Sequence, residues 1–121
     1  MKLRELHGRL IHHVPPGGEY LSGGHRYVDT LPEADGVFFL CPLCFQANGG
    51  PVGTHGVLLP FSNAPAGAYP MKNAAGMEPR WSASGTSLDD LVCTPSIQLL
   101  GGGCAWHGFI GSNGVPPGEA A

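Results

Sequence analysis

Hydrophobic residues in this chain occur in short runs that Gly- and Pro-rich stretches interrupt. The clearest runs are residues 37–40 and 55–61, and each has the length and the aromatic or branched content of a strand. Similar runs predict strands at 25–28, 80–84 and 107–110, with an extended segment at 92–100. Ser87, followed by Asp89 and Asp90, predicts one short helical turn. The pattern as a whole predicts a mostly β fold.

The N-terminal residues 1–14 fit two local structures. Leu3, Leu6 and Leu10 have helical spacing, whereas Gly8 and the Pro-Pro-Gly-Gly that follows favour extended structure, which we prefer. We expect one domain of 121 residues, with an extended N-terminal arm at 1–35, a β core at 36–115 and a tail at 116–121.

Composition is consistent with a folded but loop-rich domain. Gly (20) and Pro (12) are abundant enough to suggest disorder, but the hydrophobic fraction of 42% favours a packed core. The segment 62–79 is rich in Ala, Gly and Pro, and a loop of this length is often functional.

Two short motifs carry the chemistry of the chain. Cys41-Pro-Leu-Cys44 directly follows the strand at 37–40, and Cys104-Ala-Trp-His107 follows a Gly-Gly-Gly run. Two residues between the ligands of each pair let both reach one ion, and three thiolates with one imidazole form a closed tetrahedral zinc set. We therefore predict a structural Zn²⁺ held by Cys41, Cys44, Cys104 and His107, in a zinc-ribbon-like β domain with long loops and extended termini. Such a metal contributes directly to the free energy of folding.

Two further residues are alternative ligands. Cys93 and His55 have the right donor atoms to replace a member of the set. The plainer interpretations are that Cys93 is a small buried hydrophobic residue before Pro95 and that His55 is a turn residue leading into a strand. We favour these interpretations over a role for either residue in the metal site.

Charge and hydropathy argue against several classes of protein. The net charge is −3, and three of the six basic residues lie within the first nine positions, which is a poor pattern for neutralising phosphates. No apolar run reaches the roughly 18 residues of a membrane span, and the N-terminus has no apolar signal segment. We expect a protein that is not exported by a signal peptide, with no membrane partner and with nucleic acid disfavoured as a partner.

The sequence gives little support for an enzyme. It carries no G-x-S-x-G or H-E-x-x-H hydrolase motif, no phosphate-binding P-loop and no deaminase-type H-x-E…P-C-x-x-C motif. Asp89 and Asp90 are the only paired carboxylates, and they are better explained as the first turn of a short helix. A closed set of four ligands leaves no position for a reactive water. We expect a non-catalytic protein.

The Thr94-Pro-Ser-Ile97 segment, the Cys104–His107 motif with the aromatic strand after it, and the Asn113-Gly114 turn suggest a relationship. Together with the preceding Cys-rich motif, they resemble small uncharacterised proteins of tailed phages and prophages, some of whose bacterial relatives lie beside ubiquitin-like conjugation genes. The resemblance spans about residues 37–115. It implies a zinc-binding β domain with ligands at Cys41, Cys44, Cys104 and His107, and no particular activity. This chain differs in Gly108, in the 62–79 loop and in its N-terminal arm.

These observations lead to one functional hypothesis and its alternatives. We expect a non-catalytic phage protein that binds other proteins, virion components or copies of itself, through its arm and loop, most simply as a virion accessory or decoration protein. The main alternative is an intracellular factor that binds a host defence or conjugation protein. A zinc ribbon that binds nucleic acid is less favoured because of the charge, and a metal-dependent hydrolase is less favoured because of the closed ligand set.

Overall fold

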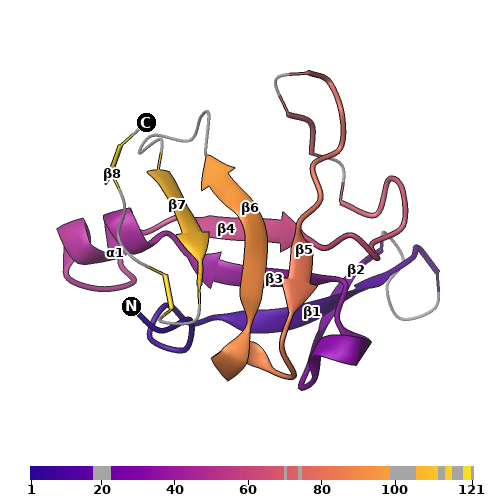
Figure 1. The fold of residues 1–121 in the computed structure, drawn as a ribbon, viewed down its shortest axis with the longest axis horizontal. Helices are drawn as coiled ribbons and strands as arrows, with labels where there is room; N and C mark the ends of the chain where they lie inside the picture. The colour runs from indigo at the N-terminus through magenta and orange to yellow at the C-terminus, as the bar shows by residue number, and fades with distance from the viewer. Residues whose placement is uncertain are drawn as a thin grey trace.

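The mostly β class is confirmed by the computed structural model, which describes residues 1–17, 23–69, 71–73, 75–98, 106–111, 114–115 and 119–120. The strands of the described part form two four-stranded sheets, in the orders β2-β1-β3-β4 and β5-β6-β7-β8 (Figure 1). The elements are β1 (Arg9–Val14), β2 (Gly24–Val28), η1 (Leu31–Glu33), β3 (Gly36–Leu40), α1 (Pro42–Asn48), β4 (Gly56–Pro60), β5 (Ser82–Ser84), η2 (Leu88–Asp90), β6 (Val92–Gln98), β7 (Trp106–Ile110) and β8 (Glu119–Ala120).

The first sheet is antiparallel throughout. β1 pairs with β2 over its length and with β3 at its N-terminal end, where Leu10 lies opposite Val37. β3 pairs with β4 along all five residues, and Val37 lies opposite Leu59. Since directly opposite residues share a face, Leu10, Val37 and Leu59 line the same face of the sheet. All three are buried, so this face is the one that covers the core.

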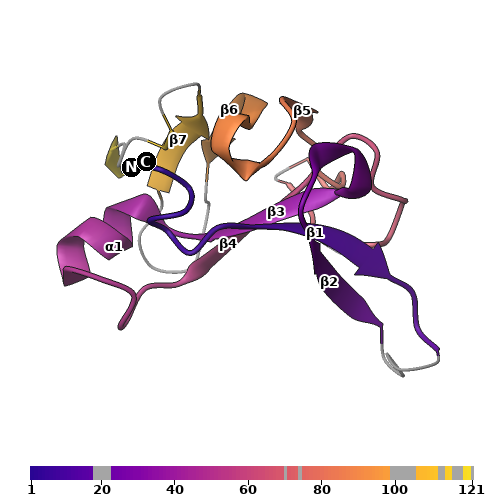
Figure 2. The same cartoon turned by 90° about the horizontal axis from the view of Figure 1, so that it is seen from below.

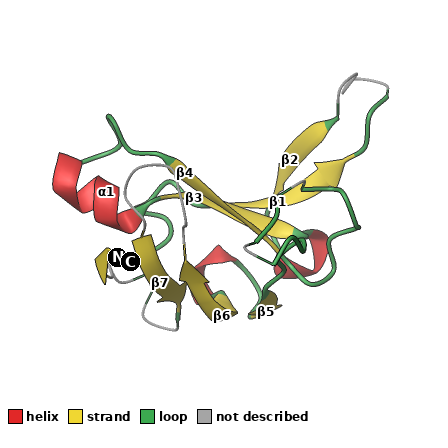
Figure 3. Ribbon diagram, turned by 90° about the horizontal axis from the view of Figure 1, so that it is seen from above, coloured by secondary structure: helices red, strands yellow, loops and turns green. Residues whose placement is uncertain are grey.

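The second sheet packs on that face. Figures 2 and 3 show it as a separate layer, while the β1–β2 hairpin projects away from the two layers. The rings of Phe39 on β3 and Trp106 on β7 meet edge to face, with centroids 6.1 Å apart, and both side chains are fully buried. This pair joins the two sheets, because an edge-to-face aromatic contact adds about 0.5–1.5 kcal/mol to the burial of the rings.

The N-terminal segment contributes to the core as well as to the hairpin. Leu3 and Leu6 are buried with Leu10 in the cluster between the sheets. Met1 exchanges backbone hydrogen bonds with Val115, at 2.8 and 2.6 Å. The segment that we expected to be an extended arm therefore supplies two strands of the first sheet and several core side chains.

The helical turn expected at Ser87 is confirmed as η2. The Ser87 side chain accepts from the backbone N–H of Asp89, and the Asp90 carboxylate accepts from the backbone N–H of Ser87, which together form a capping box. The α-helix α1 was not among the elements expected from the sequence. No helix in the described residues is both long enough and apolar enough to cross a membrane.

Candidate metal centre

Cys41 and Cys44 lie at the junction between β3 and α1. Cys41 directly follows the strand and is the N-cap of the helix, and Pro42 occupies the first helical position, where its missing N–H costs nothing. Cys44 is three residues further on, within the first turn, so both thiols lie on one side of the helix start. The helix ends at Gly49, whose left-handed backbone (φ 68°) favours glycine.

His55 approaches the same point from the next strand. It directly precedes β4, and its backbone carbonyl accepts from the Cys41 N–H at 2.9 Å, which continues the β3–β4 ladder by one pair. Cys41 and His55 therefore share the face of Phe39 and Val57, toward the core. The sequence places His55 fourteen positions from Cys41 (55 − 41), but the strand pairing makes them neighbours.

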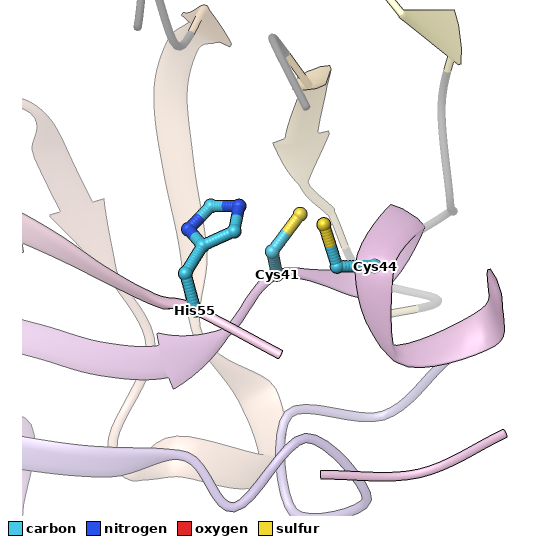
Figure 4. A group of neighbouring side chains, drawn as sticks. All are labelled: Cys41, Cys44 and His55. Atoms are coloured by element: carbon cyan, nitrogen blue, oxygen red, sulfur yellow. The ribbon is translucent and has the colours of Figure 1, made fainter. Parts of the chain in front are cut away.

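The three side chains form a compact group of donor atoms. One donor atom from each of Cys41, Cys44 and His55 lies within 4.8 Å of the others, and Figure 4 shows the side chains projecting on the same side of the ribbon. Cys41 is buried and the other two are partly exposed. Two thiolates bound to one tetrahedral zinc ion lie about 3.8 Å apart, so the group has the dimensions that such an ion needs.

The chemistry of these donors also fits a metal ion. Thiolate and imidazole ligands suit zinc better than the hard cations magnesium or calcium. The Nδ1 atom of His55 lies 3.3 Å from the carbonyl oxygen of Gly56. In the tautomer with a proton on Nδ1, His55 would donate to that carbonyl and its Nε2 lone pair would be available to a metal ion. The group can thus hold one metal ion through three protein ligands.

The second motif contributes differently from what the sequence suggested. Cys104 lies outside the described residues, and its role as a ligand stays a prediction. His107 lies on β7, is exposed, and has its Nε2 atom 3.4 Å from Ser96 Oγ; the cluster of donors does not include it. The reason is the alternation of a strand: Trp106 points into the core, so its neighbour His107 points away from it. Of the two alternative residues, His55 belongs to the cluster.

Cys93, the other alternative, lies apart from this cluster. It is buried in β6, opposite Ala83 on β5 and Ile110 on β7, and burial raises the pKa of its thiol to about 12. The structure therefore agrees with its interpretation as a small buried hydrophobic residue.

The paired carboxylates have structural partners. Asp89 accepts two hydrogen bonds from the Arg4 guanidinium, and the hydrogen bond from Arg4 lowers the pKa of Asp89. Asp90 accepts from the backbone N–H groups of Ser87 and Thr86, and these bonds lower the pKa of Asp90. Both groups tie η2 to its surroundings.

A second polar cluster is centred on Asp35, the one buried charged residue among those described. Its carboxylate accepts from the backbone N–H of His13 at 3.0 and 3.1 Å and from the Tyr69 hydroxyl at 2.5 Å. The backbone N–H of Asp35 donates to the Ile11 carbonyl. The Asp35 side chain therefore continues the hydrogen bonding between β1 and β3 by one step before the start of β3. Tyr69 anchors the 62–79 loop to the first sheet through this contact.

Comparison of the chain with protein-family models, curated proteins and solved structures gave no match. The fold and site by themselves define the class: a small domain of two antiparallel sheets with a Cys-Cys-His group that can hold a metal ion.

The site makes a direct prediction about which histidine binds zinc. We expect His55→Gln to weaken Zn²⁺ binding more than the roughly 10- to 100-fold that loss of an outer-shell partner costs. The matched variant His107→Gln is expected to bind Zn²⁺ as the wild type does. Competition titration with a zinc-sensitive chromophore measures both affinities. Loss of binding in His107→Gln with normal binding in His55→Gln would favour the ligand set read from the sequence alone.

The Asp35 cluster makes a prediction about stability and pH. Tyr69→Phe removes a hydrogen bond to a buried carboxylate and should lower the free energy of unfolding by about 1.5–3 kcal/mol near pH 7. Burial, together with the bond to Asp35, raises the pKa of Tyr69. An unfolded tyrosine ionises near pH 10, so the stabilisation is present below about pH 10 and is lost as the pH rises above it.

Urea denaturation of the wild type and Tyr69→Phe from pH 6 to 11 measures this difference. Tyr27→Phe is the control, because Tyr27 is 64% exposed and its variant should match the wild type within about 0.5 kcal/mol. A difference between Tyr69→Phe and the wild type that stays constant through pH 11 would contradict the role of the neutral phenol.

Proposed function

We propose that this protein is a non-catalytic β domain, stabilised by one structural zinc ion, that acts by binding another protein. The observation that carries the proposal is the Cys41-Cys44-His55 group, which lies at the end of β3 and the start of β4. Thiolate-rich zinc sites are typical of structural metals, whose binding energy is spent on folding. The sequence prediction of Cys104 as a fourth ligand, which would be the third thiolate, belongs to the same proposal.

The contacts around Phe39 support a role for Cys104. Trp106 packs against Phe39 with a centroid separation of 6.1 Å. In the sequence, Cys104 comes two residues before Trp106, and Cys41 comes two residues after Phe39. A fourth ligand from this motif would connect the second sheet to the first through the metal, and would close the tetrahedral set.

The location of the group supports a structural role over a catalytic one. The groove of about 520 Å³ beside β4 has none of the three ligands in its lining. The ligands instead come from the end of a strand, the first turn of a helix and the start of the adjacent strand, which are places where a metal fixes backbone geometry. Binding of a protein partner is then left to the surface of the domain.

We propose a virion accessory or decoration role as the simplest one for a domain that resembles phage proteins, although the resemblance itself implies no particular activity. The alternative is an intracellular factor that binds a host protein. Mass spectrometry of purified particles separates the two: the virion role requires the protein in the particles, and its presence only in the lysate of infected cells favours the host factor.

Removal of the metal tests the structural role. A free zinc concentration 100-fold above Kd stabilises the folded state by about 2.7 kcal/mol. Chelation should therefore lower the unfolding temperature by about 10 °C for a domain of this size. Added Zn²⁺ should restore it, whereas Mg²⁺ should not, because Mg²⁺ prefers oxygen ligands. Circular dichroism during heating measures the change. A metal-free protein with the same unfolding temperature as the zinc-loaded protein would refute a structural zinc.

A further inference from the structure

The strand β4 has an open edge. It is the outermost strand of the first sheet and pairs only with β3 among the described strands. Cys41 N–H donates to His55 and Phe61 N–H donates to Asp35, which shows that odd-numbered residues from 55 to 61 direct their backbone groups toward β3. In an antiparallel pair the alternate residues direct theirs the other way, so the N–H and C=O of Leu58 face outward.

Backbone groups next to Leu58 are already used. The Pro60 carbonyl accepts from Trp81 N–H at 3.0 Å, and the Gly56 carbonyl lies 3.3 Å from Nδ1 of His55. The open stretch is therefore short and centred on Leu58. Figure 1 shows the chain rising beyond the C-terminal end of β4 before it returns to β5. A short open edge with defined ends suits one added strand better than indefinite edge-to-edge pairing.

A groove of about 520 Å³ lies along this edge. Its walls come from the segment 71–81 on one side and from the C-terminal half of β6 on the other. Met77 is 65% exposed there. Thioether side chains adapt to different apolar partners, and an indole gives a large rigid contact. The apolar members of the lining are Leu58, Leu59, Met71, Met77, Pro79, Trp81, Pro95 and Ile97.

The charges of the groove indicate the charge of its occupant. Glu78 and Arg80 neutralise each other through an ion pair of 3.3 Å, and Arg80 also donates to the carbonyls of Pro65 and Pro79. Lys72 lines the groove and forms no ion pair with any residue that the structure describes. The uncompensated charge of the lining is therefore positive, and it is complementary to an acidic side chain.

We propose that the groove along β4 binds an extended peptide segment of a partner protein, which adds as a strand at Leu58, places apolar side chains against Met77 and Trp81, and presents an Asp or Glu to Lys72. This is the strand-addition mode of peptide recognition. The inference rests on the proposed protein-binding function and names its surface. A second copy of this chain is a poorer occupant for two reasons. The two walls of the groove flank the edge of β4 and restrict access by a folded domain, and a symmetric partner would place a second positive Lys72 near the first.

The test uses the zinc-loaded full chain and a displayed library of random 12-residue peptides as the probe. Selected peptides should alternate apolar and polar residues and contain an acidic residue. Leu58→Pro removes the outward N–H and leaves the β3 ladder intact, since an edge strand tolerates proline where the N–H faces outward. Binding of the synthesised peptides should fall at least tenfold in this variant, as measured by fluorescence polarisation.

The control places the same substitution on the other open edge of the sheet. The Ile11 carbonyl accepts from the Asp35 N–H on the β3 side of β1. The backbone groups of the next residue, His12, therefore face β2, where His12 pairs with Arg26. Because Arg26 directs its backbone groups toward β1, the N–H of the residue before it, His25, faces the open edge of β2. His25→Pro should bind the selected peptides as the wild type does. Zinc content and the unfolding temperature of each variant show whether it has folded.

Hydrogen exchange on the wild type keeps the test independent of the proline variant. The Leu58 amide should exchange rapidly in the protein alone and become protected when a selected peptide is added. Equal binding by Leu58→Pro and the wild type, or protection of the His25 amide instead, would overturn strand addition at β4 and leave the proposed function standing. Failure of the library to yield any peptide would also overturn this inference. The proposed function fails on a different result, an unfolding temperature that does not change when zinc is removed.

Discussion

The pairing of Cys41 with His55 is the constraint on which the site and the edge strand both depend. β4 has a single neighbouring strand among those described, and on its other side Trp81 bonds only its C-terminal end, at Pro60. A slip of one residue would move every β4 side chain to the opposite face. It would also carry His55 away from the thiols, because Cys41 and His55 share a face only in the observed register. The Cys-Cys-His group and the strand register therefore specify each other.

Other contacts hold the two ends of this unit. Phe39, two residues before Cys41, packs against Trp106 of the second sheet. The Cys-Cys-His group therefore lies where the two layers meet. At the opposite end of β3, the Asp35 carboxylate accepts from the backbone of β1 and from Tyr69. The Cys-Cys-His group lies at one end of the strand pair, and this polar cluster lies at the other end and holds the loop that borders the groove. A rigid edge strand loses little entropy when it pairs with a peptide.

Much of the fold could be predicted from the sequence. The runs at 37–40 and 55–61 became β3 and β4, and Ser87 with its two aspartates became a capped turn, because these signals are local. Cys41 and Cys44 were identified from their spacing alone. The first β-hairpin was harder to predict, because Leu3, Leu6 and Leu10 have helical spacing although all three reach the same core.

The third ligand shows why spacing alone was insufficient. Cys104-Ala-Trp-His107 looks like a two-ligand turn, but Trp106 begins a strand and directs His107 outward. His55 carried no motif, and its neighbour in space, Cys41, is distant in sequence. The signal that identifies His55 is the antiparallel pairing of β3 with β4. That pairing places Cys41, the residue after β3, opposite His55, the residue before β4. The sequence named His55 only as an alternative ligand, and a register argument could have favoured it over His107.

The most direct test of the account is the metal content and coordination shell of the wild-type protein as purified, from elemental analysis and X-ray absorption at the zinc edge. The account predicts one zinc per chain, with thiolate sulfurs at about 2.3 Å and at least one imidazole nitrogen at about 2.0 Å. A folded protein without metal, or a zinc shell made only of oxygen ligands, would contradict it.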